Sequence, residues 1–93
     1  MPTLSMDTVV VRRSEPITRE VDGELVMLDP RQSMYFALDS IGGRIWELLQ
    51  QPQQVDALCR SLSEEFDAPV ATCRADVLAF LAQLVDADLV SIA

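Results

Sequence analysis

The chain contains no histidine and no lysine, and its only basic side chains are seven arginines. Without histidine it lacks the residue that proteins use most often as a general base and as a metal ligand. Its two cysteines, Cys59 and Cys73, form no C-x-x-C pair, so neither a zinc framework nor a redox motif is present. Each lies in an apolar helical pattern, which predicts reduced thiols in the core of a cytosolic protein. We therefore expect no catalytic residue, no metal site and no cofactor.

Basic residues are also few: the chain has fifteen carboxylates and seven arginines, which gives a net charge of −8. Such a charge repels phosphate backbones and anionic lipids, which excludes nucleic acid and membrane as partners and favours basic peptides. A signal peptide and a membrane-spanning apolar run are also missing, so we expect a cytoplasmic protein.

The hydrophobic pattern changes its period once, near residue 39. Before that point four short segments alternate or are rich in β-branched residues, which predicts strands over residues 9–11, 16–21, 24–28 and 33–38. The Asp22-Gly23 pair is typical of a tight hairpin turn. The last three of these segments therefore predict a three-stranded antiparallel meander.

After residue 39 the apolar spacing becomes helical. Asp39 or Ser40 can cap a first helix that ends before Pro52. A second helix is predicted over residues 53–66, a third over 71–86, and an extended tail over 89–92. We expect an α+β domain, winged helix-turn-helix-like, with a three-stranded antiparallel sheet followed by three helices. The domain would span residues 9–93 after a flexible N-terminus over residues 1–8.

The third strand of the meander would be an edge strand if the strand order follows the chain. It contains Met34, Tyr35 and Phe36 in succession and no lysine or proline. Natural sheets normally protect such an edge with charge, because an unprotected edge pairs with foreign strands. This edge is therefore either covered by the chain's own tail or open to a peptide strand.

The third helix carries a wider apolar surface than one sheet face needs. Val77, Leu81 and Leu84 suffice for the core. The remaining apolar side chains are Cys73 and Phe80 on one flank and Leu78 and Val85 on the other. A groove between this helix and the edge strand could hold an extended peptide, which is one alternative to a core that is fully covered by the chain itself.

Two other functions agree less well with the sequence. A winged helix that binds DNA needs a basic recognition helix, but the second helix has Arg60 against three carboxylates. The sequence 38–41 is similar to the Asp-Ser-Leu box of acyl and peptidyl carrier proteins, in which the serine, here Ser40, takes a phosphopantetheine arm. Carriers have a long helix before that box, whereas strands are predicted here.

Two stretches resemble the signature of a known family. They are Tyr35-Phe36-Ala37-Leu38-Asp39-x-x-Gly42-x-x-Ile45-Trp46-x-Leu48-Leu49 and Ala75-Asp76-Val77-x-x-Phe80-Leu81-x-x-Leu84-Val85 with the later Leu89-Val90. The family is the PqqD-like family of RiPP recognition elements, which includes the stand-alone proteins of lasso-peptide clusters. The resemblance covers essentially the whole chain. This sequence departs from the family pattern at Gln53-Gln54, where a threonine usually caps the helix, and at Ala87-Asp88, where a glycine usually precedes the final Leu-Val.

The resemblance implies a chaperone that binds the N-terminal leader of a ribosomally made precursor peptide. The leader would add as a strand to the third strand, pack on the third helix and be presented to a transglutaminase-like leader protease and an ATP-dependent cyclase. By position, the groove would comprise Ser33, Met34, Tyr35, Phe36, Ala37, Cys73, Asp76, Val77, Phe80 and Leu84. Asp76 would either accept a hydrogen bond from the leader or only interact with the helix dipole. Alternatives are a chaperone for a radical-SAM or other RiPP pathway, and a homodimer formed through the open edge.

Overall fold

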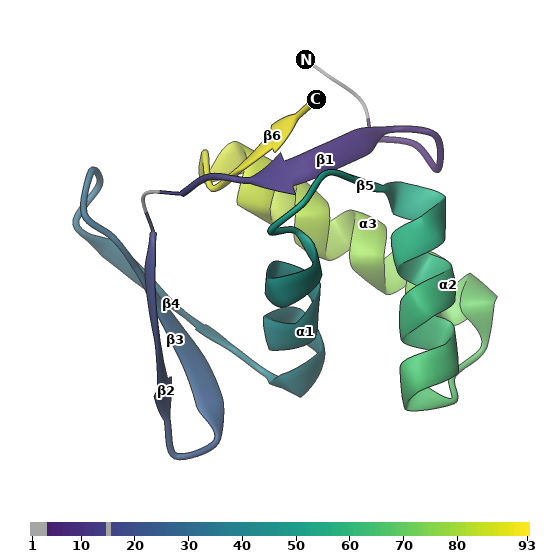
Figure 1. Cartoon of the computed structure of the whole chain (residues 1–93), viewed down its shortest axis with the longest axis horizontal. Helices are drawn as coiled ribbons and strands as arrows, with labels where there is room; N and C mark the ends of the chain where they lie inside the picture. The colour runs from purple at the N-terminus through teal and green to yellow at the C-terminus, as the bar shows by residue number, and fades with distance from the viewer. Residues whose placement is uncertain (1–3, 15) are drawn as a thin grey trace.

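The computed structural model describes residues 4–14 and 16–93 and contains two small antiparallel sheets and three helices (Figure 1). The elements are β1 (Val9–Arg12), β2 (Ile17–Val21), β3 (Glu24–Asp29), β4 (Met34–Leu38), α1 (Ser40–Leu48), β5 (Gln53–Gln54), α2 (Val55–Phe66), α3 (Val70–Asp86) and β6 (Val90–Ile92). The predicted α+β class with a winged-helix-like arrangement is confirmed.

The meander predicted from the alternating segments is the sheet β2-β3-β4, and its strands follow chain order. Asp22 and Gly23 both have positive φ, 51° and 83°, and join β2 to β3. Both central residues of a type I′ turn need that conformation, and such turns match the twist of the strands they connect. The local turn signal in the sequence was therefore sufficient to predict this hairpin.

The first strand, β1, belongs to a second sheet that the sequence did not predict. It pairs with β5 on one side and with β6 on the other. The extended tail expected after the third helix is thus β6, and it pairs with β1 rather than with β4. The middle of β1 is buried, with Val10 fully inaccessible to solvent.

Helix ends follow local chemistry. Asp39 caps α1, because its Oδ1 accepts a hydrogen bond of 2.7 Å from the Gly42 amide. Asp67, with φ 51°, terminates α2 in the left-handed conformation. The second helix starts at Val55 rather than at Gln53, since the two glutamines before it pair with β1. The first helix ends at Leu48, four residues before the proline expected to stop it.

The core lies among the three helices, the sheet that contains β1 and β6, and the inner face of β2-β3-β4. Its largest fully buried side chain is Trp46 of α1. Arg12 of β1 stacks over that indole at 5.3 Å and donates a hydrogen bond of 3.1 Å to the Trp46 carbonyl, which joins the second sheet to α1. In Figure 1 the β2-β3-β4 sheet projects to one side of α1 and α2 lies on the other, while α3 runs diagonally from α2 to the turn before β6.

Part of the expected flexible N-terminus is structured. The Met6 and Thr8 carbonyls accept hydrogen bonds of 3.0 and 2.9 Å from the Asp56 and Val55 amides at the start of α2. Leu4 and Met6 pack against the core. Residues 4–8 are therefore held by the domain, and the expectation for residues 1–3 lies outside the described residues. Among those described, no helix combines the length and apolarity that crossing a membrane requires.

Candidate functional site

The edge strand β4 pairs with β3 on one side only, and within residues 4–14 and 16–93 no strand occupies its other side. The opposite edge strand, β2, carries Arg19 and Glu20, whereas β4 consists of Met-Tyr-Phe-Ala-Leu without charge. Charge on an edge discourages pairing with foreign strands, and its absence permits it. The hydrogen-bonding edge of β4 is therefore available to an added strand.

The side chains of β4 alternate between the two faces of the sheet. Cross-strand pairing places Tyr35 opposite Leu28 and Phe36 opposite Met27. Met27 is fully buried and Phe36 packs against the core, so Phe36 marks the inner face. Tyr35 is 75% exposed on the outer face, where it lies in one row with Leu28 and Ile17. A strand added to β4 would extend both faces.

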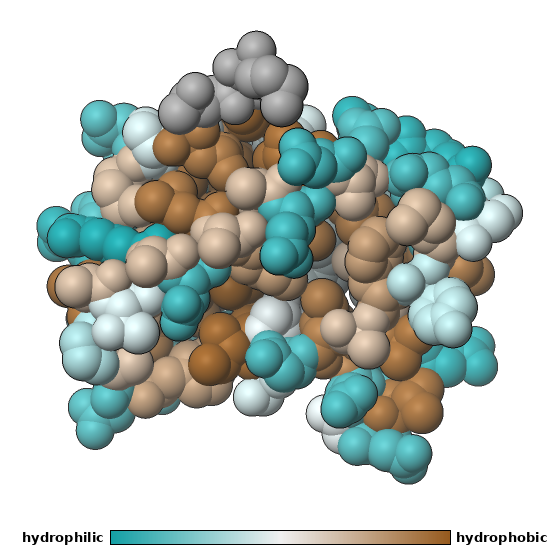
Figure 2. Space-filling model, turned by 180° about the vertical axis from the view of Figure 1, so that it is seen from behind, coloured by the Kyte–Doolittle hydropathy of each residue, from teal (hydrophilic) through white to brown (hydrophobic). Residues whose placement is uncertain are grey.

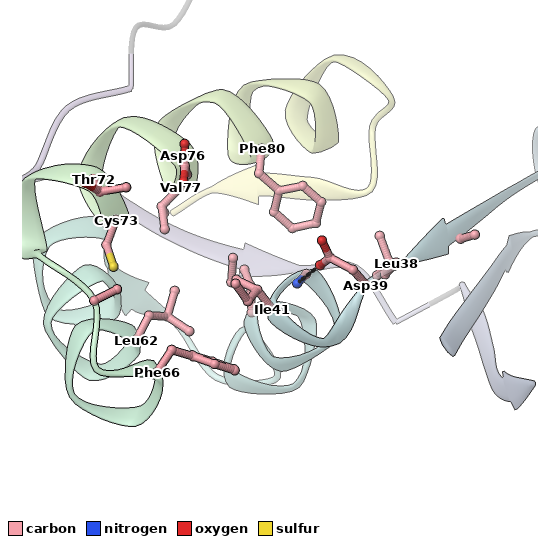
Figure 3. Close-up of a pocket in the computed structure, with 14 residues that line it drawn as sticks. Leu38, Asp39, Ile41, Leu62, Phe66, Thr72, Cys73, Asp76, Val77 and Phe80 are labelled. Carbon is pink, nitrogen blue, oxygen red and sulfur yellow. Dashed lines mark hydrogen bonds between the residues drawn. The ribbon is translucent and has the colours of Figure 1, made fainter. Parts of the chain in front are cut away.

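An apolar pocket of about 360 Å³ begins where β4 ends. It is lined by Ala37, Leu38, Asp39, Ile41, Gly42, Ile45, Leu62, Phe66, Ala68, Thr72, Cys73, Asp76, Val77 and Phe80. These residues come from the end of β4 and from all three helices (Figure 3). From behind, apolar side chains are visible in the hollow between the helical part and the sheet (Figure 2). The pocket thus continues from the open strand edge into the helical layer.

The third helix divides its apolar side chains between the core and this pocket. Val77, Leu81 and Leu84 are buried, as the helical spacing predicted. Phe80 and Cys73, on one flank, are only partly buried and line the pocket together with Val77. The Phe80 ring lies against the start of α1: a Cβ on Gly42 would be 3.4 Å from its Cζ. A Cβ at this position would make only an ordinary van der Waals contact with the ring.

Ion pairs join the helices that line the pocket. Arg44 of α1 binds Glu65 of α2, with Nε 2.9 Å from Oε1, and Glu47 of its own helix at 3.1 Å. These hydrogen bonds raise the pKa of Arg44 above its ordinary value. Asp56 of α2 binds Arg74 of α3 at 3.1 Å. The hydrogen bond from Arg74 lowers the pKa of Asp56, against the opposing effect of burial. The helices that form the pocket walls are thus joined to one another.

The two cysteines are free and differ in environment. Cys59 is fully buried in the core, and burial raises its pKa, so it stays a neutral thiol at neutral pH. Cys73 is partly exposed and lines the pocket. Only one of the two thiols therefore lines the pocket.

The structure brings only part of the expected set to the pocket. Ala37, Cys73, Asp76, Val77 and Phe80 line it. The strand residues Ser33, Met34, Tyr35 and Phe36 lie beyond the pocket along β4 or the turn before it, and Leu84 is buried in the core. Sequence patterns did not identify the pocket walls from α1, α2 and the loop after α2, which are Ile41, Gly42, Ile45, Leu62, Phe66 and Ala68. Ile41 and Phe66 are exposed at 45% and 38%, which only the structure reveals.

Ser40, the residue of the carrier-protein alternative, is exposed at the first position of α1. Strand β4 leads directly into that helix, and no helix precedes it within the described residues. The Asp39 side chain is engaged in capping. Capping accounts for the Asp-Ser pair, and the helical bundle of a carrier is not formed.

The chain is a winged-helix-like α+β domain in which an unpaired strand edge adjoins an apolar pocket. A family model described as coenzyme PQQ synthesis protein D (PqqD) matches residues 24–90. The chain therefore belongs to the PqqD family. Among curated proteins no match was found.

Three solved structures are similar over nearly their whole length. TbiB1, in complex with the TbiA(β) leader peptide, is 26% identical with a TM-score of 0.76, over 87% of this chain and 94% of that one. The PqqD truncation of Methylobacterium extorquens PqqCD, a stand-alone RiPP recognition element, is 23% identical with a TM-score of 0.80, over 96% and 95%. Lasso peptide synthetase B1 complexed with the leader peptide is 20% identical with a TM-score of 0.69, over 88% and 96%. The last two likenesses concern the fold alone.

Proposed function

We propose that the chain is a RiPP recognition element that binds the leader of a precursor peptide in lasso-peptide biosynthesis. The leader adds to the open edge of β4 as an antiparallel strand, and its apolar side chains enter the pocket beside α3. The observation that carries this proposal is the continuity of the unpaired β4 edge with the pocket lined by Phe80, Val77 and Cys73. Backbone hydrogen bonds would supply affinity and the pocket would supply specificity.

The negative charge at the pocket favours a leader that has a hydrogen-bond donor or a basic side chain next to the apolar residue that enters the pocket. Asp39 and Asp76 both line the pocket and are exposed, and the whole chain carries −8. Asp39 already accepts the Gly42 amide through Oδ1. Asp76 is therefore the carboxylate that we propose to bind the leader.

The role proposed is presentation without chemistry. The bound precursor would be delivered in the cytoplasm to a leader protease of the transglutaminase-like type and to an ATP-dependent cyclase. A homodimer that pairs two β4 edges would compete with the leader for the same hydrogen bonds. The complex of TbiB1 with a leader peptide supports a leader peptide as the ligand.

The match to the PqqD family model favours a second candidate, a chaperone for a radical-SAM enzyme or another RiPP pathway. Both candidates use the same groove and differ in the precursor and in the enzyme that receives it. The precursor and the enzymes encoded beside the gene distinguish them.

Fluorescence anisotropy tests the proposal. The probe is a fluorescein-labelled leader peptide from the precursor reading frame beside the gene, and a scrambled peptide of the same composition is the control. We expect saturable binding at micromolar concentration for the leader and none for the scrambled peptide. Equal binding of the two peptides would exclude sequence-specific recognition, and no binding of either would refute the proposed function.

A further inference from the structure

A cluster of polar side chains joins three segments at the end of the β2-β3-β4 sheet that lies away from α1. At its centre is Asp88, in the turn between α3 and β6. Its Oδ1 accepts hydrogen bonds from Arg13 Nη2 at 2.7 Å and Nε at 3.1 Å. Its Oδ2 accepts one from Arg31 Nη1 at 3.3 Å, and its carbonyl accepts one from Arg31 Nη2 at 2.9 Å. One aspartate therefore connects the segment after β1 with the turn between β3 and β4.

A second branch of the cluster runs through Gln32 of the same β3–β4 turn. Its Nε2 donates to the Ala87 carbonyl at 2.7 Å and to Asp29 Oδ2 at 2.6 Å. Asp29 is the one buried charged residue described, with 0% of its surface exposed, and it also accepts the Arg31 amide at 3.0 Å. The β3–β4 turn is thus ordered internally by Asp29 and joined externally to Ala87 and Asp88.

The backbone of Asp88 explains why a side chain here is unexpected. Its φ is 61°, in the left-handed region that glycine adopts without strain. A glycine here would satisfy the same backbone requirement without strain. In this chain the position keeps the conformation and adds a carboxylate, and that carboxylate is what Arg13 and Arg31 bind.

These contacts matter because they lie at the end of the β2-β3-β4 sheet that is away from α1. At the other end of the sheet, Leu25 packs on Gly43 of α1, and Leu38 leads into that helix. Nearer the β3–β4 turn, the outer strand β2 is exposed along its whole length. The polar cluster therefore attaches this end of the sheet to the helical part, next to the C-terminal end of α3.

We propose that Asp88 is a positioning residue that fixes the β3–β4 hairpin against the end of α3, and so sets the spacing of the groove between β4 and α3. This inference rests on the proposed function, because the groove matters only if a leader lies in it. Without the Asp88 carboxylate the sheet samples more positions relative to α3. The apparent leader affinity then falls in proportion to the fraction of molecules with the correct spacing.

Three variants of the full chain test the inference. Asp88→Gly keeps the left-handed backbone and removes the carboxylate, while Asp88→Asn keeps an acceptor and removes the charge. Asp86→Asn is the matched control, because it removes an exposed carboxylate at the end of α3 that makes no hydrogen bond with the described residues. Amide hydrogen exchange by NMR, thermal unfolding and anisotropy with the leader peptide are measured on each.

We expect Asp88→Gly to bind the leader about three- to tenfold more weakly, Asp88→Asn to lie between it and the wild type, and Asp86→Asn to match the wild type. Amides of β4 and of the β3–β4 turn should exchange about fivefold faster in Asp88→Gly, with those of α2 unchanged. The unfolding midpoint should move by less than about 4 °C, since relief of backbone strain offsets the lost contacts. A purely structural role would instead lower the midpoint and accelerate exchange throughout.

Unchanged exchange in β4 of Asp88→Gly would overturn the inference, as would unchanged leader affinity. A wild-type chain that does not bind the leader would refute the proposed function, and the exchange data would still decide whether Asp88 holds the hairpin.

Discussion

Replacing Phe80 by alanine removes the aromatic wall of the pocket while leaving the β4 edge in place. The ring is partly buried, packs beside Gly42 at the start of α1 and presents its remaining surface to the pocket. Phe80→Ala therefore tests whether the pocket contributes to leader binding separately from strand addition.

The expected loss of affinity follows from the apolar surface that the Phe80 ring and a leader side chain would cover on each other. A phenylalanine side chain has on the order of 200 Å² to bury, and Phe80 keeps a minor part of it open. Burial of about 50 Å² of the ring at ~25 cal/mol per Å² contributes about 1.2 kcal/mol to the free energy of binding. Burial of the leader side chain against the ring contributes a similar amount. Because alanine retains some of this contact, we expect a loss of about 1–2 kcal/mol, or roughly five- to thirtyfold in Kd.

The assay is anisotropy with the labelled leader peptide, accompanied by circular dichroism and thermal unfolding. Leu78→Ala is the matched control, because Leu78 is also a partly buried side chain of α3 packed on the core but does not line the pocket. Both variants should lose some stability through lost packing. Only Phe80→Ala should lose affinity. A folded Phe80→Ala chain that binds as tightly as the wild type, or a Leu78→Ala chain equally impaired, would refute the assignment of the pocket.

Three further predictions concern other parts of the chain. Iodoacetamide should label Cys73 faster than Cys59, because burial shields Cys59 and raises its pKa, and saturating leader peptide should protect Cys73. Peptide mapping by mass spectrometry measures both effects. Equal labelling of Cys73 with and without the leader would contradict its placement in the site. Asp39→Ala should cost about 1 kcal/mol through loss of the cap on the Gly42 amide, a fall of about 4–8 °C in unfolding midpoint that Asp39→Ser largely avoids. Burial raises the pKa of Asp29, but the hydrogen bonds from Gln32 and Arg31 and the charge of Arg31 outweigh it and lower the pKa below 3.8. Its contribution to stability is therefore full above pH 3.8 and lost as the pH falls through the lower pKa of the folded state, and Asp29→Asn should flatten that part of the acid unfolding curve.

Much of the fold follows from local patterns. The change of period near residue 39 separates the meander from the helices, and Asp22-Gly23 supplies the hairpin turn. The second sheet could not be predicted in this way. Strand β1 pairs with segments about 40 and 80 residues further along, and Gln53-Gln54 has no strand propensity of its own, so only the tertiary fold defines β5.

The candidate site was predicted in part. Helical spacing separates Val77, which faces inward, from Phe80 on the flank, and both line the pocket. Strand alternation places Tyr35 on the outer face of the sheet and Phe36 on the inner face. The run of consecutive apolar residues in the sequence does not by itself show this difference. The walls from α1 and α2 depend on how three helices cross, and that is set by packing rather than by local periodicity.

Isotope-filtered NMR of the labelled chain with unlabelled leader peptide tests the central claim most directly. The account predicts cross-strand contacts between the leader and the backbone of Met34–Leu38 in antiparallel register, together with contacts from a leader side chain to Phe80. Leader contacts confined to β2 or to the outer face around Tyr35, with the free edge of β4 unchanged, would contradict it.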